Sequence, residues 1–398
     1  MNTIRPLVLS LALVLAQTTA ARSIALPAAS DQDLTPTTLT ASPANLAKAA
    51  RLETLPVQFA WVLPPEQTLQ AQSPYAAESR EFWMRVSAAE LQSGKRVQTS
   101  APEALFRLSP IGTSKSAIDP LQVEITSGMG TFARGNGLKN AANAAELKAA
   151  NAPFPSGTLA FQLKADVGQG AMQIRVAKAA QDYLLHVYEP NSSQTLSLKT
   201  DRITAVHGQT FKVIAAANDG GAVEAIGGFL SAPNGLERAL DFKREGNQYV
   251  ATVAHDGLAG EGEGLWEIHT FSSQGGIQRD AKTVIVSSVP RARLGGNLES
   301  LTGKKGALSV SVSIDVAAAS RYELRGVLQG FDGKTVRVGA VASSAASLKP
   351  GSQALTLVFD AETIAKSGLQ APFSVRDLTL TDQATLAVQE TRQQAIAL

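Results

Sequence analysis

The side chains best suited to chemistry stand close together in the segment Gly262–Val286. Within it, Glu267 and His269 are two residues apart, and a carboxylate beside an imidazole can act as a general acid/base pair. The spacing also has a structural explanation, because alternate residues of a β-strand point to the same face. In a strand, Trp266 and Ile268 would point into the core and Glu267 and His269 would face outward. We therefore expect Trp266 and Ile268 to be core anchors, and we assign no catalytic residue.

A second candidate chemistry lies nearer the N-terminus, where carboxylates and aromatic rings occur together. Glycoside hydrolysis needs only two well-placed acids, so these residues could line a saccharide cleft. They are Glu66, Glu78, Glu81, Glu90, Trp61, Trp83 and Tyr75. Trp61 alternates with other large apolar residues, as core residues of a strand do, so ordinary packing is the competing explanation.

Calcium is the metal that the sequence favours most. Asp219 and Asp256 each precede a glycine in a turn between expected strands, and both could offer oxygen ligands. Turn formation alone explains both equally well. The four histidines lack the i, i+2 or i+4 spacing of zinc ligands, and the chain has no cysteine. We expect no cofactor, with weak calcium binding as the alternative.

The first 21 residues have the features of a secretory signal peptide. Arg5 precedes the short apolar run from Leu7 to Ala16, and small residues follow it at the expected cleavage zone. We therefore expect an exported chain, periplasmic or secreted. No later apolar run is long enough to span a bilayer. The 36 basic and 34 acidic residues nearly balance, which argues against a nucleic-acid partner.

Alternation of apolar and polar residues dominates the rest of the chain. The clearest case is Leu308–Val316, LSVSVSIDV, where every second residue is a large aliphatic one. Such strands bury one face and expose the other, as antiparallel sheets do. Short helices are expected from Ser87 to Gly94, where Ser87 and Glu90 form a capping box, from Leu138 to Ala150, and from Asp360 to Gly368. The expected class is mainly all-β, in tandem immunoglobulin-like β-sandwiches.

Changes in composition divide the chain into five expected parts. They are a signal peptide (1–21), a flexible leader (22–50), an N-terminal β-rich domain with a few short helices (51–199), an immunoglobulin-like sandwich (200–293) and a C-terminal sandwich (294–398). In immunoglobulin-like sandwiches an aromatic residue near the start of a strand anchors the core. Trp266 takes this position in the middle sandwich, and Tyr322 and Phe373 are the corresponding anchors in the last one.

Several short segments resemble one family of exported bacterial proteins. They are GLWEIHT with QRDAKT, LLHVYEPNS, FLSAPNG, EFWMRVSAAELQSG and EALFRLSP. Through them the chain, from about residue 50 to 395, resembles the family named domain of unknown function 4785. The resemblance implies tandem β-rich, immunoglobulin-like domains. It implies no known activity and supplies no catalytic residue.

These observations favour a non-enzymatic exported protein with a binding, adhesion or scaffold role at the cell envelope or outside the cell. We expect a monomer with a protein or glycan partner, no nucleic acid and no membrane span. One alternative is a secreted polysaccharide-acting hydrolase or accessory module that uses the N-terminal carboxylates. Another is an inhibitor or chaperone that adds a strand to a partner's sheet edge. Immunoglobulin-like modules present loops and strand edges as contact surfaces, and the absence of catalytic motifs fits that role. Because a fold does not determine a function, the preference for binding depends partly on this analogy.

Overall fold

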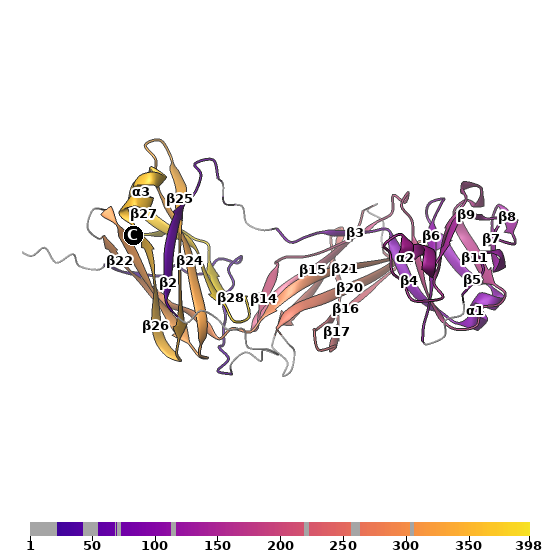
Figure 1. The fold of residues 1–398 in the computed structure, drawn as a ribbon, viewed down its shortest axis with the longest axis horizontal. Helices are drawn as coiled ribbons and strands as arrows, with labels where there is room; N and C mark the ends of the chain where they lie inside the picture. The colour runs from indigo at the N-terminus through magenta and orange to yellow at the C-terminus, as the bar shows by residue number, and fades with distance from the viewer. Residues whose placement is uncertain are drawn as a thin grey trace, which may run out of the picture. The chain divides into compact units, whose positions relative to one another are not determined.

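The computed structural model describes residues 22–42, 55–67, 69, 73–112, 117–218, 223–255, 263–302 and 306–398. They divide into two compact units. Unit 1 combines Met1–Gln70 with Pro290–Leu398, and unit 2 is Ala71–Val289. Both are built of mainly antiparallel sheets with few helices, so the expected class of tandem β-sandwiches is confirmed (Figure 1). The expected signal peptide lies outside the described residues.

Unit 1 is one sandwich of two sheets. The first has the order β1 (Arg22–Ala25), β22 (Ala292–Thr302), β23 (Leu308–Val316), β26 (Gly351–Phe359). The second has the order β2 (Val57–Val62), β25 (Val336–Leu348), β24 (Ser320–Phe331), β27 (Gln370–Asp382), β28 (Ala387–Arg392), with β29 (Ile396–Ala397) on β27. Burial in β23 alternates residue by residue, as its sequence predicts. Tyr322 is buried and donates its hydroxyl hydrogen to the Ala318 carbonyl oxygen at 2.7 Å. Phe373 is half-buried and packs against the same core.

The N-terminal segments lie elsewhere than expected. Residues 22–50 were expected to be a flexible leader, but β1 pairs antiparallel with β22, joining Ile24 to Leu298. Residues from 51 onward were assigned to the N-terminal domain, yet β2 pairs with β25, joining Trp61 to Val341. Each segment pairs with a strand that would otherwise be the edge of its sheet, and an uncovered edge favours non-native pairing. The early segments therefore complete the C-terminal sandwich.

Unit 2 contains two sandwiches, and the first spans about residues 80–189. One sheet has the order β4 (Glu81–Val86), β12 (Tyr183–Tyr188), β6 (Leu105–Pro110), β10 (Leu159–Leu163), β9 (Leu138–Asn143). The other has the order β5 (Lys95–Thr99), β11 (Gly170–Val176), β7 (Val123–Ser127), β8 (Gly130–Phe132). A core that includes Phe82, Phe106 and Phe161 lies between them.

The second sandwich of unit 2 contains the Trp266 segment. One sheet has the order β18 (Lys243–Glu245), β19 (Gln248–His255), β15 (Gln209–Ala217), β13 (Leu196–Thr200), β3 (Ala77–Ser79). The other has the order β14 (Thr204–Val206), β21 (Ile277–Ser288), β20 (Gly264–Gln274), β16 (Ala225–Ser231), β17 (Glu237–Ala239). The expected boundary at residue 199 falls at the end of β13, a strand of this sandwich. Because β3 also pairs with β13, this sandwich draws on residues before and after the first one.

The helices are short, and two of the three have the expected bounds. In α1 (Ala88–Ser93) the Ser87 and Glu90 side chains form the predicted capping box. In α3 (Ala361–Ser367) the Asp360 side chain caps the start, and Gly368 ends the helix in the left-handed conformation. The third prediction, a helix from Leu138 to Ala150, is half wrong, because Leu138–Asn143 is β9 and only α2 (Ala144–Ala149) is helical. Single 3₁₀ turns occur at Pro120–Gln122 and Ala165–Val167. No helix among the described residues is long and apolar enough to cross a bilayer.

Candidate functional site

The residues of the opening motif occupy opposite faces of β20. Trp266 is 2% exposed and Ile268 is fully buried, within the core of the second sandwich. On the outer face, His269 Nε2 lies 2.9 Å from Glu267 Oε2. This hydrogen bond is the main cause that lowers the pKa of Glu267 below its usual range. A carboxylate with a lowered pKa is a poor proton donor at neutral pH, so this pair alone does not support acid catalysis.

His269 belongs to a row of rings and cations on the outer sheet faces of unit 2, which we call the mixed ladder. Its members in order are Phe229, His269, Lys282, Trp83, His186, Arg107 and Phe154. Phe229 stacks on His269 at 4.6 Å, and Trp83 stacks on His186 at 4.7 Å between centroids. Lys282 Nζ lies 5.9 Å from the Trp83 ring centroid. The ladder thus joins strands of both sandwiches by stacking and cation–π contacts.

Carboxylates beside the mixed ladder compensate its positive charge. Glu81 Oε2 lies 2.7 Å from His186 Nε2, and Asp280 Oδ2 accepts a hydrogen bond from the Trp83 backbone N–H at 2.7 Å. Burial raises the pKa of Asp280 to about 6, and the charge of Glu81 acts in the same direction. Asp280 is therefore a group of this cluster that can change its proton occupancy near neutral pH.

Replacing Asp280 with asparagine is expected to remove a pH-dependent loss of stability. The folded pKa of about 6 lies above the ordinary value of 3.8, so the folded chain binds this proton more tightly than the unfolded chain. The free energy of unfolding should therefore fall as pH rises from about 4 to about 6. The Asp280→Asn variant keeps an oxygen that can accept from the Trp83 N–H but has no such titration. Its stability relative to wild type should grow by up to about 3 kcal/mol over this range.

Urea denaturation at a series of pH values measures this difference. Asp182→Asn is the matched control, because Asp182 pairs with Arg85 on the surface and should leave the shape of the profile unchanged. Parallel profiles for wild type and Asp280→Asn would contradict the prediction.

A buried ion pair connects the two sandwiches of unit 2. Glu189 is 0% exposed and Arg279 is 5% exposed at the side chain, and Arg279 Nη2 lies 2.7 Å from Glu189 Oε2. The other oxygen of Glu189 accepts the backbone hydrogens of Ser100 and Ala101. Two charges this deeply buried are tolerated because each is paired and hydrogen-bonded. Glu189 follows β12 and Arg279 lies in β21, and no sequence motif connects the two residues.

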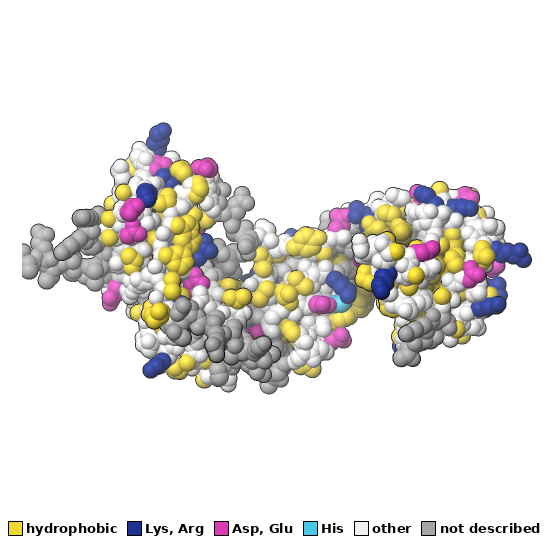
Figure 2. Space-filling view, viewed as in Figure 1, with side chains coloured by type: hydrophobic (Ala, Val, Ile, Leu, Met, Phe, Trp, Pro, Cys, Tyr) yellow, Lys and Arg dark blue, Asp and Glu magenta, His cyan; other side chains and the backbone are white. Residues whose placement is uncertain are grey.

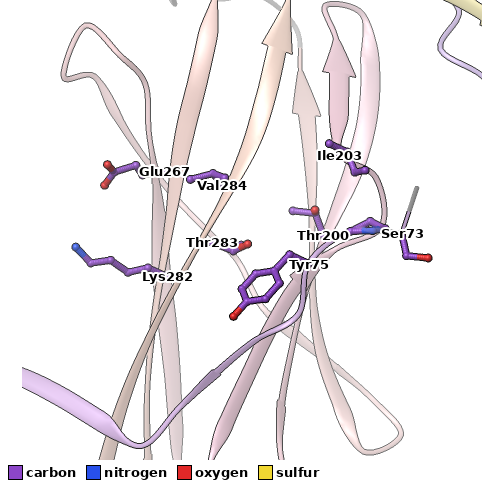
Figure 3. Close-up of a pocket in the computed structure, with 9 residues that line it drawn as sticks. Ser73, Tyr75, Thr200, Ile203, Glu267, Lys282, Thr283 and Val284 are labelled. Carbon is purple, nitrogen blue, oxygen red and sulfur yellow. The ribbon is translucent and has the colours of Figure 1, made fainter. Parts of the chain in front are cut away.

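A groove of about 580 Å³ lies beside β21 in the second sandwich. It is lined by Val284 of β21, by Tyr75, which precedes β3, and by Ile203, which precedes β14 (Figure 3). The Tyr75 side chain is 77% exposed. Figure 3 also shows Glu267 and Lys282 pointing to one side of the sheet, where they place opposite charges at the groove. The arrangement combines apolar walls, one aromatic ring and a charged rim, as binding sites do.

The structure gives the carboxylates of the hydrolase alternative different surroundings. Glu66 lies in unit 1, whereas the other three lie in unit 2, each beside its own base. Glu78 pairs with Arg80 at 2.7 Å and Glu90 with Lys95 at 2.7 Å, while Glu81 contacts His186. The three aromatic residues also have different surroundings. Trp61 stacks on Phe59 in unit 1, Trp83 belongs to the mixed ladder and Tyr75 lines the groove.

Both calcium candidates, Asp219 and Asp256, lie outside the described residues. The neighbouring Asn218 is engaged in a turn, because its side-chain oxygen accepts from the Thr195 N–H at 2.9 Å and its amide donates to the Ser193 carbonyl at 2.7 Å. Within the described part of the chain, no three His, Cys, Asp or Glu side chains are grouped to hold a metal.

The family comparison gives two matches along the chain. The family is named domain of unknown function DUF4785. Its N-terminal domain model matches residues 48–189, and its C-terminal domain model matches residues 292–398. The chain belongs to the DUF4785 family. The resemblance read from the sequence is thereby confirmed. In this DUF4785 chain the first match ends where the first sandwich of unit 2 ends.

Solved structures similar to this DUF4785 chain include a DUF4785 family protein from Legionella pneumophila. It is 22% identical, with a TM-score of 0.67, over 90% of this chain and 98% of that one. Two further structures each have a TM-score of 0.20, which is too low to carry an argument about the fold. They are a 1.5-MDa bacterial ice-binding adhesin (16% identity, 51% of this chain, 65% of that chain) and Escherichia coli alpha-2-macroglobulin (12%, 74%, 33%). No curated protein matches the chain.

Proposed function

We propose that the chain is a non-enzymatic, exported binding protein that acts at the cell envelope or outside the cell, with the groove beside β21 as its contact surface. The observation that carries the proposal is the groove itself, where an exposed tyrosine ring faces apolar walls. Exposed aromatic rings at the centre of a concave surface are the side chains that contribute most to recognition. Export is inferred from the features of the first 21 residues.

The distribution of charge supports binding over hydrolysis. Hydrolysis of a glycosidic bond needs two carboxylates on opposite sides of one cleft, one of them available as an acid. Glu78, Glu81 and Glu90 each contact a different basic side chain, and among the described residues Glu267 is the single carboxylate that lines the groove. On the face drawn in Figure 2 the acidic and basic side chains are interspersed, which does not favour a nucleic-acid partner. We infer a monomer that binds a protein or glycan.

Blocking the groove tests this proposal. The Ile203→Arg variant places a long charged side chain on one wall, while the control Leu265→Arg places the same charge on an outward residue of β20 that is 60% exposed and does not line the groove. The purified wild-type chain should recover one stoichiometric partner from envelope or medium fractions. The control should recover it equally and the groove variant should not.

Two results would refute the proposal. One is equal recovery of the partner by Ile203→Arg and Leu265→Arg, which would place the contact surface elsewhere. The other is turnover of a polysaccharide panel by the wild-type chain, which would restore the hydrolase alternative. Equal melting temperatures of the two variants show that loss of binding does not come from unfolding.

A further inference from the structure

We propose that the occupant of the groove is an extended polypeptide segment that adds a strand to the edge of β21. This inference depends on the proposed function, because it names the ligand of the same groove. Strand addition needs backbone N–H and C=O groups that point outward along a sheet edge and have no partner within the protein.

The register of β20 and β21 determines which backbone groups point to that edge. The two strands form a hairpin in which Gln274 faces Ile277 across the two-residue Gly275-Gly276 turn. In such a hairpin the residues that exchange hydrogen bonds alternate with residues that do not. The bonded positions of β21 are therefore the odd-numbered ones, including Thr283 opposite Ile268. The backbone groups of the even-numbered residues point away from β20.

Hydrogen bonds at both ends of this edge agree with the alternation. The Asp280 carbonyl oxygen accepts the Ser79 hydroxyl hydrogen, and the Val286 N–H donates to the Ile203 carbonyl at 2.9 Å. Between these ends lie Lys282 and Val284. Their outward backbone groups have no hydrogen-bond partner within the described residues.

The free part of the edge and the groove coincide. Lys282 and Val284 both line the groove, so the N–H and C=O of these residues border it. The stretch from Asp280 to Val286 spans about 20 Å at the usual rise per residue, enough for a segment of about five residues. Such a segment can form up to about four backbone hydrogen bonds with the two free residues.

The side chains around this edge favour one kind of peptide. An added strand alternates its side chains between the outer face and the sandwich interior. Outward positions lie beside the Lys282 ammonium group, which favours a carboxylate, whereas inward positions meet Thr200 and Ile203, which favour a small or aliphatic side chain. A glycan would use ring stacking, and Tyr75 is the one aromatic ring among the described residues that line the groove. The free peptide groups therefore favour a polypeptide.

The test uses short random peptides displayed on phage and selected on the immobilised, purified chain. The best binder is then synthesised as a series in which a single N-methyl group moves along its backbone. An N-methyl group removes one donor, so alternate positions should weaken binding by about fivefold to tenfold and the intervening ones by less than about twofold. Binders should be enriched in acidic residues alternating with small or aliphatic ones.

A matched pair of variants tests the same edge from the protein side. Val284→Pro removes an N–H that bonds to no described residue, and proline is tolerated at sheet edges for this reason. It should weaken peptide binding at least tenfold, to about 10% or less of the wild-type affinity. Val284→Thr keeps the N–H and the β-branched shape, and should change the affinity by less than about twofold. Because the N-methyl series uses the wild-type chain, it decides the question even if the proline variant fails to fold.

The outcomes separate this inference from the proposed function. Peptide binding that is insensitive to N-methylation at every position would overturn strand addition while leaving the groove as a binding surface. A second such result would be a glycan that binds the wild-type chain but not Ile203→Arg, while the phage selection yields no peptide. That result would also overturn strand addition and leave the groove as a binding surface. A concentration-dependent dimer that Val284→Pro abolishes would also overturn the inference, because a second copy would then occupy the edge.

Discussion

Replacing Glu189 with glutamine is expected to lower the free energy of unfolding of unit 2 by about 3–5 kcal/mol. The substitution keeps the size of the side chain and its ability to accept from the Ser100 and Ala101 N–H groups, but removes its charge. The Arg279 guanidinium then remains 5% exposed without its counter-ion. The guanidinium still donates hydrogen bonds to neighbouring oxygens such as Gln194 O and Ser192 Oγ, but these neutral acceptors do not replace the attraction of a carboxylate for a charge at such depth. Because the pair joins the two sandwiches, their contact should weaken first.

Urea denaturation followed by tryptophan fluorescence measures this loss. Glu78→Gln is the matched control, since Glu78 pairs with Arg80 at the surface and its loss should cost less than about 1 kcal/mol. The double variant Glu189→Gln with Arg279→Met removes both charges and should recover much of the stability. A loss below about 1 kcal/mol for Glu189→Gln alone would show that the pair contributes little.

Replacing Trp266 with alanine is expected to cost about 3–5 kcal/mol of stability. The indole is 2% exposed and lies in a core with Phe211, Ile268 and Ile285. His255 contacts its ring edge-on at 5.0 Å between centroids, so the substitution leaves both aliphatic and aromatic neighbours without a packing partner. The remaining cavity adds to the lost transfer free energy, because a β-sandwich core relaxes only in part.

The adjacent residue supplies the control. Leu265 lies on the opposite face of β20 and is 60% exposed, so Leu265→Ala should change the stability by less than about 0.5 kcal/mol. The two substituted residues are adjacent in the sequence and lie on opposite faces of the same strand. Equal losses for both would contradict the assignment of Trp266 as a core residue.

Local patterns predicted the elements of this fold well. Alternation in LSVSVSIDV corresponds to β23, and alternation from Leu159 to Leu163 corresponds to β10. The capping residues Ser87 and Asp360 indicated where α1 and α3 begin. The prediction of a helix over Leu138–Ala150 was wrong for the first half of the segment. Its alanine content favours a helix, whereas pairing with β10 holds that half as a strand.

The candidate site was harder to predict, because its residues come from distant parts of the chain. Tyr75 and Glu267 were noted for different reasons, and only the fold places both at one groove. The sequence indicated no chemical role for Asp280. Its raised pKa comes from burial beside Glu81, which precedes it by almost half the chain. No spacing rule connects such residues.

The order of apolar and polar residues was enough to establish a β-rich chain, the inward position of Trp266 and the outward positions of Glu267 and His269. Those features depend on each strand separately, since the geometry of one strand determines which side chains share a face. The tertiary structure decided which strands pair, that β1 and β2 complete the last sandwich, and that Glu189 meets Arg279. Backbone hydrogen bonds are alike for every strand, so the choice of partner depends on packing between residues far apart in the sequence.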